Sequence, residues 1–118
     1  MAFIVHGWRE DIKASWAHDL ISNLSFYRGG CILFMDYSFY AKIPFYRTVI
    51  NHFPYISKVL LYKLKQLEED GFNPDNMYMF GYSFGARLVI DAAAEFGHQR
   101  IKQIDGKKSC YFIEVIQL

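Results

Sequence analysis

A serine flanked by two glycines offers the clearest chemistry in the chain. Gly81-Tyr82-Ser83-Phe84-Gly85 has the pattern G-x-S-x-G and lies between an apolar run over 77–80 and a helical pattern over 86–96. In this strand-to-helix context the serine is strained, and Gly81 and Gly85 must be small because strand and helix nearly collide there. Ser83 is therefore a candidate nucleophile for acyl transfer, and the helix N-terminus favours the developing negative charge. The alternative is a turn in which Ser83 only caps a helix.

A second motif predicts part of the oxyanion hole that such a nucleophile needs. His6-Gly7-Trp8 directly follows the first apolar run, residues 2–5. An α/β-hydrolase places there the loop that gives the second N–H of its oxyanion hole. We therefore assign the two oxyanion donors to the backbone N–H groups of Trp8 and Phe84, which should converge on one point beside the Ser83 hydroxyl. Taken alone, a His-Gly pair after a strand is also typical of a plain turn.

Four short apolar runs alternate with helical patterns, which predicts an α/β fold: a partial α/β-hydrolase fold with a parallel sheet and helices on both faces. The strands should begin near Ala2, Cys31, Met77 and Ile101. Right-handed crossovers place the Cys31 strand at one edge, followed by the Ala2, Met77 and Ile101 strands.

The helical patterns have recognisable ends. Asp11 is a possible N-cap of the first helix, and Pro54 suits the first turn of the second, which Gly71 closes. Between them, the aromatic loop over 37–46 either packs in the core or lines an acyl-chain groove.

Composition excludes several classes of protein. The 118 residues are 53% hydrophobic and carry a net charge of +1, which does not indicate a nucleic-acid-binding protein. No apolar run reaches the roughly 18 residues of a transmembrane span, and the start of the chain lacks the pattern of a signal peptide. Cys31 and Cys110 could form one disulfide, although Cys31 could equally be a small buried hydrophobe.

The motifs together resemble the neutral, pancreatic-type lipase family of α/β-hydrolases, in an insect-like and truncated form. The resemblance rests on the segments 2–8, 15–16 and 76–86, together with a strand ending in Asp36. It implies that residues 1–105 are the central part of a lipase-type domain, with 106–118 a divergent tail of unknown role. It also implies a secreted, extracellular serine esterase that hydrolyses acylglycerols or phospholipids without a metal or other cofactor.

The rest of the catalytic triad departs from the family pattern. Asp105 lies near the place of the triad acid, but Gly106-Lys107-Lys108-Ser109 replaces the segment that family members carry next. Asp105 is therefore either the triad acid or a non-catalytic neighbour. No histidine follows it, although the fold places the histidine last in chain order.

The four histidines of the chain precede Asp105, and none is well placed as the base. His98 should lie about 20 Å from Ser83, at the far end of the helix. His18 should lie on a solvent-exposed helix face and His52 in a loop, while His6 shapes the oxyanion loop rather than acting as base. We expect Asp36 to orient loops.

These observations favour a carboxylic ester hydrolase that is a fragment with little activity alone. A lipid or ester is then the expected partner, with possible contact to a lipid interface. The alternative is a non-catalytic lipid-binding or storage protein on the same fold. Retention of Ser83 in an intact G-x-S-x-G motif favours the first.

Overall fold

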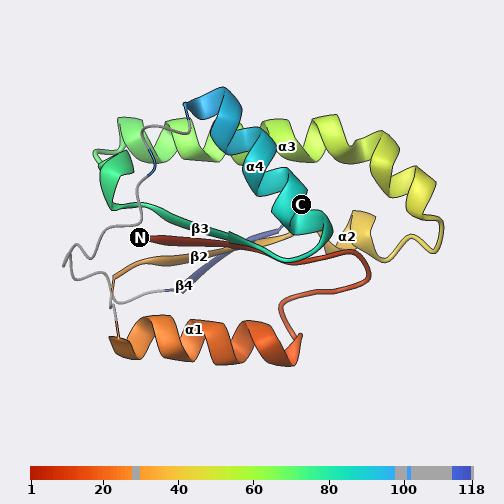
Figure 1. Cartoon of the computed structure of the whole chain (residues 1–118), viewed down its shortest axis with the longest axis horizontal. Helices are drawn as coiled ribbons and strands as arrows, with labels where there is room; N and C mark the ends of the chain where they lie inside the picture. Colours follow the sequence, from red (N-terminus) through yellow and green to blue (C-terminus); the bar gives the residue numbers. More distant parts are fainter. Residues whose placement is uncertain (28–29, 98–100, 102–112, 118) are drawn as a thin grey trace.

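A four-stranded parallel sheet forms the centre of the protein, with helices on both faces (Figure 1). This computed structural model describes residues 1–27, 30–97, 101 and the backbone of 113–117. The strands are β1 (Ala2–Val5), β2 (Ile32–Asp36), β3 (Tyr78–Gly81) and β4 (Ile113–Gln117), in the order β3-β1-β2-β4. The predicted α/β class, with a parallel sheet covered on both faces, is confirmed.

Helix α1 (Ser15–Tyr27) covers one face of the sheet, whereas α3 (Tyr46–Glu69) and α4 (Phe84–Phe96) cover the other (Figure 1). The short helix α2 (Ser38–Ala41) follows β2, and the 3-10 turn η1 (Pro74–Asn76) precedes β3. This arrangement places β1 between its two neighbours, as the right-handed crossovers predicted.

Strand alternation explains why both faces are apolar. Phe3, Val5, Leu33 and Met35 belong to the core beneath α3 and α4. The residues between them in the strands, such as Ile4 and Phe34, belong to the smaller core against α1. Successive side chains of a strand point to opposite faces, so a strand buried on both faces must be apolar throughout.

The predicted strand order was wrong at one edge. The Cys31 strand, β2, is not an edge strand, because β4 pairs with it in parallel from Ile32 with Ile113 to Asp36 with Gln117. Residues 113–117, which lie in the predicted divergent tail 106–118, thus extend the sheet. Ile101 is not in a strand, and residues 102–104 of the predicted fourth strand lie outside the described residues. Cys31 is buried and Cys110 lies outside the described residues.

Two helix starts also differ from the prediction. Helix α1 begins at Ser15, because Asp11 forms a turn in which its side chain accepts the Lys13 N–H at 2.8 Å. Helix α3 begins at Tyr46, so Pro54 lies inside it and His52 is helical. Burial of Val49 outweighs the helical hydrogen bond that Pro54 cannot donate to the Ile50 carbonyl.

Candidate active site

The candidate site lies where the chain reverses direction across the sheet. The chain passes from β1 to β2 on one side, and β3 then returns to the other side of β1. The crevice outside the carboxyl ends of strands at such a switch point is the usual ligand site of open α/β sheets. His6 follows β1 and Ser83 follows β3, so both predicted motifs meet at this place.

Ser83 occupies the strained turn that the motif predicted. Its backbone has φ 53° and ψ −113°, a left-handed conformation that non-glycine residues rarely adopt, and its side chain is exposed. Such strain costs of order 1–3 kcal/mol and persists only where the surrounding structure enforces it. The turn lifts the hydroxyl out of the sheet at the N-terminus of α4.

The flanking glycines are required by close backbone packing. A Cβ on Gly81 would lie 2.6 Å from the Cα of Ala86. A Cβ on Gly85 would overlap the carbonyl oxygens of Val5 and His6. Because these obstacles are backbone atoms, no side-chain rotation relieves them, so both glycines let α4 approach β1 and β3.

Gly7 brings the loop after β1 directly against the serine. A Cβ on Gly7 would lie 3.2 Å from the Cβ of Ser83 and 3.1 Å from the Tyr82 carbonyl oxygen. The loop is also fixed on its outer side, where the Arg9 N–H donates to the Ala41 carbonyl at 3.0 Å and the Trp8 indole donates to the Ile43 carbonyl at 3.3 Å.

The two predicted oxyanion donors lie on either side of this junction. Trp8 follows Gly7, and Phe84 is the first residue of α4. Neither backbone N–H donates a hydrogen bond within the described residues, so both are free to bind an incoming group. That they converge on one oxygen beside Ser83 stays a prediction.

Glu10 is a site residue that sequence reasoning missed. Its Oε2 accepts the backbone N–H of Gly7 at 2.8 Å, and its Oε1 accepts the Trp16 indole N–H at 3.0 Å. One carboxylate thus ties the turn beside Ser83 to α1 and leaves the next N–H, that of Trp8, free. An acidic residue three positions after a glycine in a loop is the signal that could have suggested it.

His6 is buried and fully engaged, as expected for a residue that shapes the loop. Its side chain is 0% exposed and stacks on Tyr37 with ring centroids 4.2 Å apart. Its Nδ1 lies 2.8 Å from the Gly7 carbonyl oxygen, which can only accept, so Nδ1 carries a proton. Its Nε2 accepts the Tyr37 N–H at 3.1 Å, and Asp36 also lies beside it.

Asp36 and Tyr37 fix the same loop from β2. Asp36 accepts the Ser38 N–H at 2.9 Å, which supports its predicted role in orienting loops. The Tyr37 hydroxyl donates to the His6 carbonyl at 2.6 Å. Burial raises the pKa of this phenol, and the negative charge of Glu10 raises it further.

None of the described histidines forms a hydrogen bond with Ser83, in keeping with the expectation that no histidine of the chain is well placed as the base. His18 is exposed on α1, as predicted, whereas His52 lies in α3 and not in a loop. The Nδ1 of His52 lies 2.8 Å from the Thr48 carbonyl. His98 and Asp105 lie outside the described residues.

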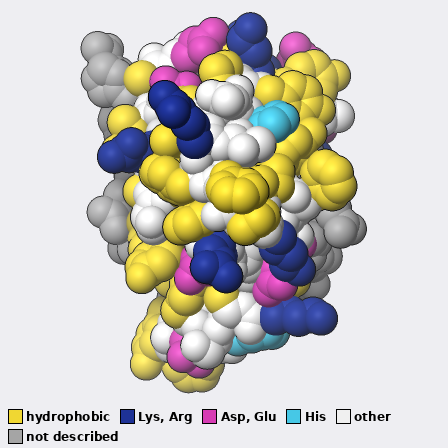
Figure 2. All heavy atoms as spheres, turned by 90° about the vertical axis from the view of Figure 1, so that its right-hand side faces the viewer, with side chains coloured by type: hydrophobic (Ala, Val, Ile, Leu, Met, Phe, Trp, Pro, Cys, Tyr) yellow, Lys and Arg dark blue, Asp and Glu magenta, His cyan; other side chains and the backbone are white. Residues whose placement is uncertain are grey.

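Apolar side chains gather around this end of the molecule. Figure 2 looks onto the end of the sheet where β1 and β3 terminate, and it shows hydrophobic side chains across the face with basic ones among them. Among the aromatic side chains, Phe39 is 73% exposed, Phe45 72% and Tyr82 50%. Part of the aromatic loop is therefore exposed, although Tyr37 is buried.

No group of three or more His, Cys, Asp or Glu side chains in the described part of the chain is arranged to hold a metal ion. None of the described helices combines the length and apolar character that crossing a membrane requires.

Comparison with known proteins shows a similarity to a lipase-related protein. No family model and no solved structure matches the chain. The chain is 26% identical over 112 residues to pancreatic lipase-related protein 2 of Bos taurus, in a match that covers 92% of the chain. The chain spans only 24% of the length of that relative. The similarity supports a relationship to lipases, and it agrees with the strained serine and the glycine-packed turn.

Proposed function

We propose that this chain is the nucleophile-bearing part of a lipase-like carboxylic ester hydrolase. The observation that carries the proposal is the backbone of Ser83, at φ 53° between β3 and α4, with Gly7 packed against it. A strained serine at a helix N-terminus, beside two free N–H groups, is the arrangement that acyl transfer requires.

In the proposed reaction, the Ser83 hydroxyl attacks the ester carbonyl and its proton passes to a base. The N–H groups of Trp8 and Phe84 stabilise the resulting oxyanion, the alcohol leaves, and water then releases the acid. Glu10 holds the turn that presents the Trp8 donor. The exposed aromatic side chains favour acylglycerol or phospholipid substrates, and similarity to a lipase-related protein favours an extracellular setting.

No described histidine is placed to take the proton from Ser83. His6 is buried with both ring nitrogens engaged, and among the described residues neither His18 nor His52 forms a hydrogen bond with Ser83. Without a base, a serine hydroxyl stays protonated and is a poor nucleophile. We therefore expect little turnover from the 118-residue chain alone. Under the same proposal, Asp105 is either the triad acid or a non-catalytic neighbour.

The test compares the purified chain with a Ser83→Ala variant for p-nitrophenyl ester hydrolysis and fluorophosphonate labelling from neutral to alkaline pH. We expect slow labelling that mass spectrometry maps to Ser83 and that is lost in the variant. Rapid Ser83-dependent turnover would show that one of the chain's histidines is the base. No labelling at all, together with lipid binding, would support the non-catalytic alternative.

A further inference from the structure

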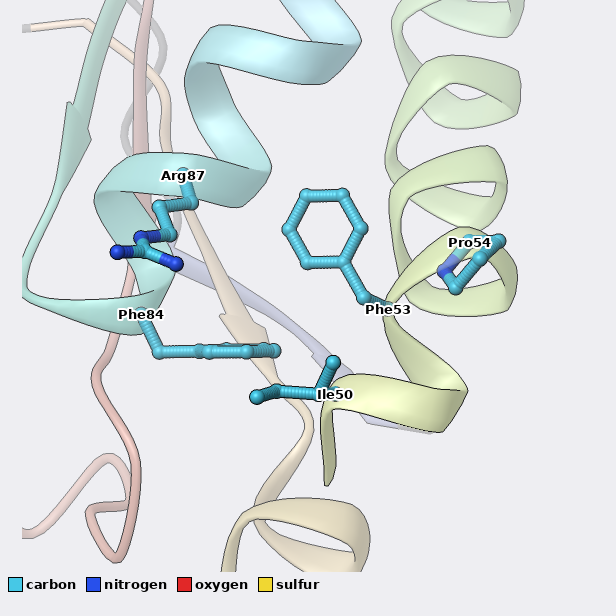
Figure 3. Close-up of a pocket in the computed structure, with 5 residues that line it drawn as sticks. All are labelled: Ile50, Phe53, Pro54, Phe84 and Arg87. Carbon is cyan, nitrogen blue, oxygen red and sulfur yellow. The ribbon is translucent and has the colours of Figure 1, made fainter. Parts of the chain in front are cut away.

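A cavity lies beside the candidate site, on the α3 side of Phe84. It has a volume of about 280 Å³ and is lined by Ile50, Phe53, Pro54, Phe84 and Arg87. Figure 3 shows Phe53 and Phe84 extending from α3 and α4 toward a common space, with Arg87 on the α4 side. Ser83 and the loop after β1 do not line it, and the cavity shares only Phe84, through its side chain, with the proposed ester-cleaving residues.

Pro54 and Ile50 line the cavity from α3. Proline has no backbone N–H, so the Ile50 carbonyl loses its usual helical partner one turn earlier. Ile50 is 44% exposed, so the mouth of the cavity reaches solvent. All of the five lining residues except Arg87 are apolar or aromatic, which suits an alkyl chain.

The one charged lining residue, Arg87, has no anionic partner among the described residues. It is exposed, and no described residue forms an ion pair or hydrogen bond with it. The nearest carboxylate along its own helix, Asp91 one turn later, instead accepts a hydrogen bond from Ser57 of α3. Arg87 thus offers an unused positive charge at the edge of an apolar cavity.

We propose that this cavity binds a single-chain anionic amphiphile, such as a fatty-acid anion, with its alkyl chain between Phe53 and Phe84 and its carboxylate against Arg87. Ligand pockets commonly begin at about 300 Å³, so the volume suits one chain rather than a lipid with two or three. A long arginine side chain can line an apolar surface with its stem while its charged end remains in water.

Isothermal titration calorimetry of the full chain with decanoate, below its micelle concentration, tests the proposal. We expect saturable binding that is weakened about fivefold by Arg87→Gln, because a partly solvated ion pair contributes modestly. Decyltrimethylammonium, with the same chain and opposite charge, should bind less tightly than decanoate. Ile50→Trp should fill the mouth and remove binding of both ligands.

Two control variants locate the effect. Lys65→Gln removes an exposed charge of α3 about three turns beyond Pro54 and should leave decanoate binding unchanged. Ser83→Ala should also bind decanoate like the wild type, so a failure of the proposed hydrolase function would not affect this result. The proposal is overturned if decanoate does not bind saturably, or if Arg87→Gln and Lys65→Gln have equal effects.

Discussion

The two sides of Ser83 differ in how they are built. On one side, the loop after β1 lies against the turn, with Gly7, Glu10 and His6 held by hydrogen bonds within the site. On the other side, none of the described histidines forms a hydrogen bond with Ser83, and the predicted triad acid lies outside the described residues. The position of the nucleophile thus depends on the ends of two neighbouring strands, β1 and β3. A catalytic base must instead come from a side chain that other parts of the fold position.

Glycine packing explains why the first side is fixed. Gly81 and Gly85 face backbone atoms, and Gly7 faces Ser83 itself. Contacts with backbone atoms cannot be relieved by rotamer changes. The loop after β1, the turn at Ser83 and the start of α4 are therefore fixed relative to one another. The strain in Ser83 is held by this packing and does not require a completed triad.

The largest expected effect comes from breaking that packing. Gly85→Ala places a methyl group against the carbonyls of Val5 and His6, and we expect a loss of more than about 4 kcal/mol of stability or a failure to fold. Gly71→Ala is the matched control, because it meets no atom within 4 Å and only its φ of +92° is unfavourable. The control should cost about 1–2 kcal/mol. Urea unfolding followed by circular dichroism measures both, and equal losses would contradict the packing argument.

Some features of this side could be predicted because their signals in the sequence are local. The G-x-S-x-G pattern identified Gly81 and Gly85, and the structure gives Ser83 the strained backbone that the pattern implies. Burial of β1 and β2 followed from their unbroken apolar character. In both cases the signal in the sequence spans a few consecutive residues, although the backbone atoms that Gly85 meets belong to Val5 and His6.

Features that depend on distant contacts could not be predicted in the same way. The pairing of β4 with β2 joins residues far apart in the chain, and no local pattern sets that register. Glu10 gains its role only when the loop and α1 bring Gly7 and Trp16 to its two oxygens. Pro54 suggested a helix start, but tertiary burial on both sides of it extends α3 back to Tyr46.

The second prediction tests whether the loop, and not the turn alone, sets the reactivity of Ser83. Glu10→Ala frees the Gly7 N–H and the Trp16 indole, which should lower the rate of fluorophosphonate labelling about tenfold, less than the loss of an oxyanion donor itself. Leaving a buried N–H unpaired should also cost about 1–3 kcal/mol. Glu10→Gln retains one acceptor oxygen and should show an intermediate rate. A labelling rate unchanged in Glu10→Ala would mean that the turn suffices.

The third prediction concerns the support of the loop from β2. Tyr37→Phe removes the hydroxyl that donates to the His6 carbonyl, with an expected loss of about 1 kcal/mol at neutral pH. Burial raises the pKa of Tyr37 in the folded protein. The contribution of Tyr37 to the free energy of unfolding is therefore complete below its pKa in the unfolded chain, near 10, and is lost as pH rises above that pKa. Urea midpoints at pH 7 and pH 10.5 should therefore show the wild-type advantage shrinking at the higher pH. A constant difference would exclude Tyr37 as the titrating group.

The smallest effect is expected at the outer end of the loop, where Asp11 lies 3.2 Å from Lys42. The backbone N–H of Lys13 lowers the pKa of the Asp11 carboxyl, and the ion pair with Lys42 lowers it further. A carboxyl with a lowered pKa stabilises the fold above its unfolded value near 3.9 and loses that contribution as pH falls through its folded value. Because Lys42 is 62% exposed, solvent screens the pair, and Asp11→Asn should cost less than about 1 kcal/mol at pH 7. Thermal unfolding should show this small difference at pH 7 and none near pH 2, where both chains lack the charge. A loss as large as that of Glu10→Ala would show that the loop is held as firmly at its solvent-exposed end as beside Ser83. The expected difference in stability between these two ends of the loop would then be wrong.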